Sequence, residues 1–94
     1  MDTISALIGL PDTYIIDVRT PGEFMGGHVA GSINIPLNEI PERLDELKSM
    51  KNIILVCASG MRSMNATGYL TQHGIKCHNG GSWTQVNYIA NNKN

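Results

Sequence analysis

The sequence predicts an α/β fold, in which a small and mainly parallel central sheet is flanked by helices on both faces. Short apolar runs, typical of buried strands, alternate along the chain with segments whose apolar residues have helical spacing. Parallel strands need a crossover connection, which is usually a helix, so this alternation favours a parallel sheet. With 94 residues, 41% of them hydrophobic, we expect one domain over 1–94 with a modest stability margin.

The first half of the chain predicts two helical segments and two strands. They are the helix 1–10, the strand 14–18, the helical turn 20–24 and the strand 33–36. Asp2 or Thr3 can cap the first helix, and Pro11 ends it. The strand 33–36 is expected near a sheet edge, because Pro36 has no N–H to donate to a neighbouring strand.

The second half predicts three helices and two strands. They are the helix 39–48, the strand 52–57, the helix 62–73, the strand 75–79, and a final helix with Trp83, Val86 and Ala90 on one face, before a polar tail at 91–94. Asn38 is the expected cap of the helix 39–48, with Pro41 in its first turn. Gly80 and Gly81 are expected to turn the chain from the last strand into the final helix.

The composition argues against several classes of function. The formal net charge is -1, and the charged residues, 16% of the chain, form no basic run, which argues against nucleic acid or a membrane surface as partner. The apolar runs are too short for a transmembrane helix, and the N-terminus lacks the pattern of a signal peptide. Two cysteines in such a chain indicate a reduced, cytoplasmic setting. We expect a monomer, and no cluster of metal ligands stands out.

The segment Asn52–Ser63 carries the clearest chemical signal. A buried strand delivers Cys57 to a tight loop at the start of a helix, where backbone N–H groups lack intrahelical partners and the helix dipole is positive. Both features favour an anion, so the thiol should ionise more easily than a free cysteine. Cys57 is therefore the candidate nucleophile. The residues expected to cradle the anion are Ala58, Ser59, Gly60, Met61, Arg62 and Ser63.

Several ordered motifs along the chain resemble the single-domain rhodanese family of sulfurtransferases. The motifs are Tyr14–Arg19, Glu23-Phe24, Gly27–Pro36, Ile54–Ser63, and Gly80-Gly81 followed by Trp83. The resemblance implies a rhodanese-like fold and a reaction in two halves. Cys57 takes a sulfane sulfur from a donor such as thiosulfate and becomes a persulfide, and then cyanide, a small thiol or a protein thiol removes that sulfur. The resemblance implies neither a metal nor an organic cofactor.

The same resemblance indicates four supporting residues, Asp17, Arg19, Glu23 and His28. Asp17 and Arg19 match a family motif and are expected to orient loops through hydrogen bonds and ion pairs, with contact between Arg19 and the donor as the alternative. Arg62 either contacts the substrate or holds the loop by pairing with a carboxylate such as Glu23 or Asp17. His28 lies in a segment that shapes the fold, with a role as a base as the alternative.

The identity of the sulfur donor and the role of the second cysteine stay open at this point. The position after the cysteine, often basic in thiosulfate-using members, is Ala58, so Arg62 is the only positive charge in the loop and a persulfide of a protein or small thiol is favoured as donor. Cys77 is expected in the middle of the strand 75–79, one step below Cys57, where it either packs or acts as a resolving cysteine.

Two other kinds of function remain as alternatives. Related phosphatases and arsenate reductases carry a longer segment between cysteine and arginine, which suits a tetrahedral oxyanion. Here only four residues intervene, which favours a sulfur atom. A non-catalytic or redox-sensing rhodanese-like module is the other alternative, although such adaptors usually lack the cysteine that this chain retains.

Overall fold

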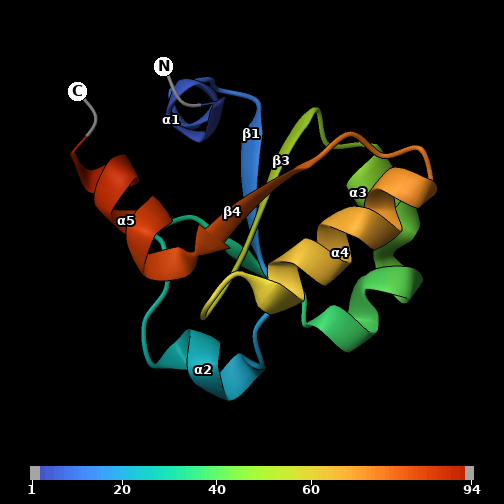
Figure 1. Ribbon diagram of the computed structural model, residues 1–94, viewed down its shortest axis with the longest axis horizontal. Helices are drawn as coiled ribbons and strands as arrows, with labels where there is room; N and C mark the ends of the chain where they lie inside the picture. Colours follow the sequence, from blue (N-terminus) through green and yellow to red (C-terminus); the bar gives the residue numbers. More distant parts are fainter. Residues whose placement is uncertain (1–2, 93–94) are drawn as a thin grey trace.

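The computed structural model, which describes residues 3–92, has the α/β architecture that the sequence predicts (Figure 1). Within that range one sheet is formed by four parallel strands in the order β2-β1-β3-β4. The strands are β1 (Thr13–Asp17), β2 (Ile33–Asn34), β3 (Asn52–Cys57) and β4 (His78–Ser82). The shortest of them, β2, lies at an edge as expected, but it ends at Asn34, two residues before the predicted end at Pro36.

Strand β3 is the centre of the sheet. It pairs with β1 from Thr13 opposite Asn52 to Asp17 opposite Val56, and with β4 up to Cys57 opposite Ser82. Because all these strands run in one direction, β1, β3 and β4 end at the same edge of the sheet. That edge is where parallel α/β folds place their sites.

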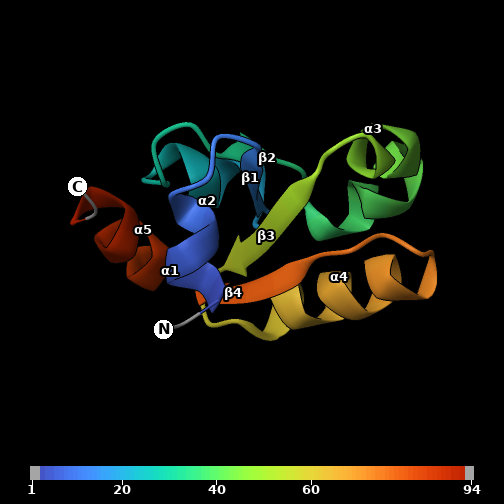
Figure 2. The same ribbon diagram turned by 90° about the horizontal axis from the view of Figure 1, so that it is seen from above.

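Helices cover both faces of the sheet, as the sequence predicts (Figures 1 and 2). On one face lie α1 (Thr3–Ile8) and α5 (Trp83–Asn91), which contact each other. On the other lie the 3₁₀ helix η1 (Leu37–Arg43), α3 (Leu44–Lys48) and α4 (Met61–Gln72). The short helix α2 (Pro21–Met25) lies beyond the carboxyl ends of the strands, next to the loop that follows β3.

The two faces have separate apolar clusters, and β3 contributes to both. Ile53, Leu55 and Cys57 belong to the cluster that includes residues of α4, whereas Ile54 and Val56 pack with Val86 of α5. This alternation follows from the two-residue period of a strand. Cys57 thus ends a strand that is buried on both sides, and its backbone position is fixed by packing.

The segment predicted as one helix over 39–48 is divided into η1 and α3. Asn38 is not its cap: η1 begins at Leu37, after Pro36, without a side-chain cap. Pro41 lies inside η1, where its missing N–H and its ring disfavour the α-helical hydrogen bond to residue 37 and favour tighter 3₁₀ turns. Ile40 of η1 and Leu47 of α3 are buried in the core on this face of the sheet.

The last strand begins three residues later than predicted, and the glycine pair lies inside it. Ile75 still donates to the carbonyl of Leu70 at the end of α4, so the chain has not yet entered the sheet. Gly80 fits the strand because it lacks a side chain: a Cβ there would lie 2.7 Å from Ile54 Cγ2. Gly81 has a φ of +82° at a register shift opposite Leu55 and Val56, a position typical of a β-bulge glycine.

The predictions for the chain ends are met in part. Helix α1 forms from Thr3 with Ile4, Leu7 and Ile8 packed on the core, and it ends at Ile8, two residues earlier than predicted, whereas Asp2 lies outside the described residues. The predicted tail 91–94 begins too early, because Asn91 is the last residue of α5 and Asn92 caps it. Residues 93–94 lie outside the described range.

Candidate active site

The loop after β3 turns sharply because of one glycine. Cys57 is the last residue of β3, and α4 begins only four residues later, at Met61. Gly60, the N-cap of α4, has a φ of +103°, which side chains rarely tolerate, and a Cβ on it would lie 3.3 Å from Gly81 Cα. The loop therefore bends back onto β4 and closes around the cysteine.

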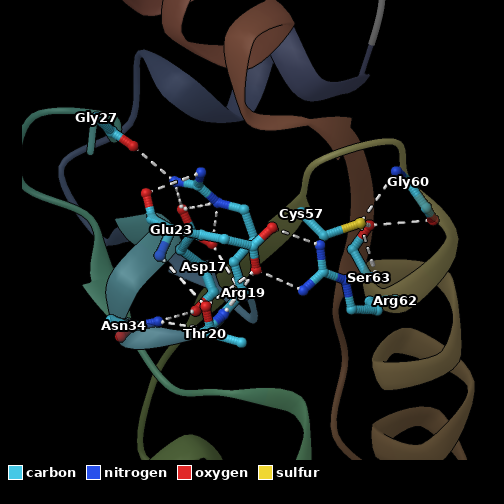
Figure 3. A network of polar contacts seen from close by, with 10 residues as sticks. All are labelled: Asp17, Arg19, Thr20, Glu23, Gly27, Asn34, Cys57, Gly60, Arg62 and Ser63. Atoms are coloured by element: carbon cyan, nitrogen blue, oxygen red, sulfur yellow. Dashed lines mark hydrogen bonds and ion pairs between the residues drawn. The ribbon is translucent and has the colours of Figure 1, made fainter. Parts of the chain in front are cut away.

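The sulfur of Cys57 lies at the centre of this loop (Figure 3). The backbone N–H of Gly60 donates to Sγ at 3.0 Å, and that of Ser63 donates at 3.3 Å. The Ser63 hydroxyl lies 3.4 Å from the same sulfur. The Cys57 side chain is fully buried, so the sulfur is surrounded by hydrogen-bonding groups of the loop and the first turn of α4.

These contacts set the ionisation of the thiol. Burial raises the pKa of Cys57, but a hydrogen bond of the Ser63 hydroxyl to the thiolate form and hydrogen bonds from the backbone N–H groups of Ser63, Gly60 and Ser59 lower it by more. The net pKa is below the ordinary value for cysteine. The reason is general: donors aimed at sulfur stabilise the charged form. This direction agrees with the expectation that the Cys57 thiol ionises more easily than a free cysteine.

Arg62 faces away from the sulfur and pairs with Glu23 of α2 (Figure 3). Its Nη1 and Nη2 donate to the two carboxylate oxygens at 2.7 and 3.0 Å, so the pair is bidentate. Thr20 and Glu23 also form a capping box at the start of α2. Of the two carboxylates considered for Arg62, Glu23 is the partner, and the pair ties α2 to the loop of Cys57.

Asp17 and Arg19 form a second ion pair, buried beneath α2. The Arg19 guanidinium donates to both oxygens of Asp17 at 2.8–3.1 Å. It also donates to the carbonyls of Glu23 and Gly27 and lies 4.8 Å above the ring of Trp83. The hydrogen bonds and the ion pair that the sequence analysis expects of Asp17 and Arg19 are thus present, and they join the segment after β1 to Glu23 and Gly27.

The side chains of the remaining site candidates lie outside the cradle of the sulfur. Ala58 is exposed on the loop, and Met61 exposes 62% of its surface at the start of α4. His28 stacks on Phe24, and its Nδ1 donates to the Phe24 carbonyl at 2.7 Å. The His28 ring is thereby held against α2 rather than aimed at the thiol.

Comparison with known proteins agrees with this geometry. Residues 1–86 match the family described as the rhodanese-like domain. The chain belongs to the rhodanese-like domain family. The sequence alone predicts a loop around a cysteine between a strand and a helix. The family assignment agrees with this loop as the candidate site.

Relatives of this rhodanese-like chain include proteins with different names. YtwF of Bacillus subtilis is 38% identical over 68 residues, or 72% of this chain and 66% of that protein. A protein named sulfurtransferase from Allochromatium vinosum is 35% identical, covering 67% of this chain and 59% of its own. A tRNA uridine(34) hydroxylase of Pectobacterium carotovorum is 33% identical, covering 80% of this chain but 23% of its own. The chain spans between about half and two thirds of the length of the first curated relatives that it matches.

Solved structures give the same fold. A rhodanese with anions from E. coli superposes with a TM-score of 0.70 at 35% identity, covering 77% of this chain and 88% of that one. A rhodanese-like domain protein from Staphylococcus aureus superposes with a TM-score of 0.75 at 30% identity, covering 86% and 79%. The rhodanese-like fold is thus shared over most of the chain.

Sequence reasoning missed one polar residue of the rhodanese-like site. Asn79 of β4 accepts a hydrogen bond from Ser63 at 2.6 Å, and so reaches the loop of Cys57 from the neighbouring strand. Its position depends on the later start of β4, which the sequence does not indicate. The capping box of α2 was also missed, although Thr20 followed three residues later by Glu23 is its usual signature.

Cys77 lies away from the thiol of Cys57, contrary to the prediction. It precedes β4 instead of lying mid-strand, and its Sγ contacts Thr67 and Thr71 of α4. His78 lies opposite Ile54, so Cys77 is more than about 10 Å from Cys57 along the sheet, beyond the reach of a disulfide. Burial raises the pKa of the Cys77 thiol. The structure therefore favours packing over a resolving role.

The described residues also bear on metals and membranes. Within residues 3–92 no group of three or more His, Cys, Asp and Glu side chains is placed to hold a metal ion. None of the helices in that range has the length and apolar character needed to cross a membrane.

The Glu23–Arg62 pair predicts a loss of stability in acid. The hydrogen bonds from Arg62 and from the Thr20 backbone lower the pKa of Glu23 from 4.5 to about 2. A carboxyl whose pKa is lower in the folded state contributes stability that is present above its unfolded pKa and lost as the pH falls through the folded pKa. We therefore expect the urea midpoint to fall between about pH 5 and pH 2, and to fall less in Glu23→Gln. Equal acid dependence of the two proteins would contradict this role of Glu23.

Proposed function

We propose that this chain is a sulfurtransferase that carries a sulfane sulfur as a persulfide on Cys57. The observation that carries the proposal is the convergence on one buried sulfur of the Gly60 and Ser63 N–H groups and the Ser63 hydroxyl. The two backbone N–H groups are fixed donors, which stabilise negative charge as it develops on a reacting group. Membership of a family with a relative named sulfurtransferase supports the same function.

The proposed reaction has two displacements at sulfur. The Cys57 thiolate attacks the outer sulfur of the donor, a new S–S bond forms, and the bond between that sulfur and the rest of the donor breaks. The donor leaves as a thiolate or, for thiosulfate, as sulfite. An acceptor thiolate or cyanide then attacks the outer sulfur, and Cys57 leaves as a thiolate. No net electrons are gained or lost by the chain.

The loop residues have distinct roles in this proposal. The backbone of Ala58, Ser59 and Gly60, with Ser63, holds the outer sulfur anion in place of the thiolate. Met61 and Met64 expose 62% and 50% of their surfaces beside the loop and offer an apolar approach for the donor. Because Cys57 is fully buried, transfer requires the loop to move aside when the donor arrives.

The charge of the loop favours a persulfide of a protein or small thiol over thiosulfate as donor. Thiosulfate is a dianion and needs cationic partners. Arg62, the only basic residue of the loop, already binds both oxygens of Glu23, so its charge is balanced within the protein. A persulfide carries at most one negative charge, so it depends less on a cationic partner than thiosulfate does. Both cysteines are free thiols, which suits a reducing compartment, and we propose the cytoplasm.

Intact mass spectrometry tests the function directly. The protein is incubated with a small-molecule persulfide or with thiosulfate, and its mass is measured before and after addition of cyanide. We expect a gain of one sulfur that cyanide removes, with faster loading from the persulfide. Cys57→Ser should not gain the cyanide-labile sulfur, because an alcohol cannot form a persulfide.

The second cysteine of the chain provides a matched control. Cys77→Ser replaces the other thiol, which lies away from the loop, by a hydroxyl of similar size. This variant should load sulfur like the native protein. Loading that depends on Cys77 and survives in Cys57→Ser would overturn the assignment. Absence of loading from either donor, with turnover of an aryl phosphate that depends on Cys57, would replace sulfur transfer by phosphatase chemistry.

A further inference from the structure

The Ser63 hydroxyl has one proton and three acceptors within reach. Its Oγ lies 2.6 Å from Oδ1 of Asn79, 3.2 Å from the carbonyl oxygen of Gly60 and 3.4 Å from Sγ of Cys57. A hydroxyl donates one hydrogen bond at a time. The shortest of the three contacts has the length of a strong O–H···O hydrogen bond, so the proton is directed at Asn79.

The backbone fixes which atom of Asn79 faces Ser63. The N–H of Gly81, which can only donate, lies 3.0 Å from the same Oδ1. The other end of the amide, Nδ2, faces the carbonyl oxygen of Gly60 at 3.4 Å. The atom near Ser63 is therefore the amide oxygen. Since that oxygen can only accept, Ser63 donates to it and turns its own lone pairs toward Cys57.

This orientation suits one protonation state of the cysteine and opposes the other. A Cys57 thiol can donate its S–H to the lone pairs of Ser63. A thiolate has no proton to give, and it gains the Ser63 O–H only if that proton leaves Asn79. The two states of the sulfur therefore need opposite orientations of one buried hydroxyl.

We propose that Asn79 is a positioning residue of the sulfur site, which holds the Ser63 hydroxyl proton away from a Cys57 thiol and yields it to a charged sulfur. Asn79 competes with sulfur for the proton, so it opposes ionisation of the resting thiol. The part that this reorientation of the Ser63 hydroxyl plays in catalysis rests on the proposed function, in which the persulfide again places negative charge in the loop. The geometry itself is independent of that function.

Titration of the Cys57 thiol tests the competition. The ultraviolet absorbance of the thiolate is followed against pH, and the same titration of Cys57→Ser is subtracted. Removal of the competing acceptor in Asn79→Ala should lower the pKa of Cys57 by about one unit, which is about ten times more thiolate at a pH below the pKa. If Asn79 only supports the loop, its loss loosens the backbone donors, and an unchanged or raised pKa overturns the proposal.

A double-mutant cycle shows whether Asn79 acts through Ser63. In the Ser63→Ala protein the hydroxyl is absent, so adding Asn79→Ala should leave the pKa of Cys57 unchanged. If Asn79→Ala shifts the pKa of Cys57 equally with and without Ser63, Asn79 does not act through the Ser63 hydroxyl. That result would overturn the proposal. The cycle removes effects that both backgrounds share, including the lost contact of Asn79 with Gly60.

A second variant keeps the test open if Asn79→Ala does not fold. Asn79→Asp retains an acceptor for Gly81 and Ser63, and a carboxylate holds a hydroxyl proton more strongly than an amide. The pKa of Cys57 should therefore rise more with Ser63 present than in Ser63→Ala. If the pKa of Cys57 rises equally in both backgrounds, only the Coulombic effect of the new charge is at work. That result would refute the proposal.

The result of the Cys57 titrations does not depend on the result of the sulfur-loading experiment. The titrations contain no sulfur donor. A protein that titrates as described but takes up no sulfur would refute the proposed function alone. A protein that loads sulfur, with a Cys57 pKa that does not respond to Asn79 through Ser63, would refute this inference alone.

Discussion

Replacement of Asp17 by alanine is expected to lower the free energy of unfolding by about 3–5 kcal/mol, the usual loss when one partner of a buried ion pair is removed. Asp17 is fully buried and accepts from Nε and Nη2 of Arg19, whose side chain is 5% exposed. Without the carboxylate, the guanidinium stays buried without a counter-charge. Since small domains have a total of about 5–15 kcal/mol, the variant should unfold at a much lower urea concentration.

A surface ion pair of the same chain serves as control. Arg43 and Glu46 form a hydrogen-bonded pair with 34% and 44% of their side chains exposed. Exposed pairs contribute little, because water and salt screen them. Glu46→Ala should therefore leave the urea midpoint nearly unchanged at neutral pH. A loss for Asp17→Ala as small as that for Glu46→Ala would show that the buried pair is not a main support of the fold.

Replacement of Gly80 by alanine is the second large expected effect, a loss of about 1–3 kcal/mol in the free energy of unfolding. Gly80 lies on β4, against the central strand and α5. An added Cβ would lie 2.7 Å from Ile54 Cγ2 and 3.1 Å from methyl groups of Val56 and Val86. These neighbours are fully buried, so they cannot move into free space and the strand must shift. Thermal or urea unfolding measures the loss.

The same substitution elsewhere in the chain should have the opposite sign. Gly68 lies inside α4, and a Cβ on it would meet nothing within 4 Å. Glycine in a helix is less favourable than alanine by about 0.5–1 kcal/mol, so Gly68→Ala should stabilise the protein. If the free energy of unfolding changes with the same sign in Gly68→Ala and Gly80→Ala, crowding at β4 does not decide the effect of an added Cβ on stability.

The parts of the fold that the sequence predicted correctly depend on local signals. The apolar run Ile53–Val56 is buried on both faces, and Cys57 follows it directly at the edge where a helix begins. The small residues of the loop and the glycine at position 60 indicate a tight turn from their chemistry alone. These signals need no knowledge of distant residues, and the strand, the loop and α4 were accordingly placed to within a residue.

The parts that were missed or left open are decided by contacts between distant segments. The start of β4 depends on space beside Ile54 and Val56, which only the packed sheet defines. The partner of Arg62 lies 39 residues away, and the choice of Glu23 over Asp17 follows because Arg19 already occupies Asp17. The contact of Asn79 with Ser63 depends in turn on where β4 lies.

The order of the strands also governs how the chain acquires its structure during synthesis. Each pairing of β3 joins distant segments, since Thr13 lies opposite Asn52 and Ile54 opposite His78, and parallel strands offer no hairpin from which pairing can start. Contacts of this kind form slowly, because long loops must close before any of them is gained.

A chain released only as far as α4 therefore has its most apolar strand open along one edge, which is the kind of surface that associates with other unfolded chains. It also has the cysteine but not the complete site, because Gly81 and Ser82 come from β4, which is synthesised later. The surroundings of the Cys57 sulfur are thus complete only after β4 has been synthesised.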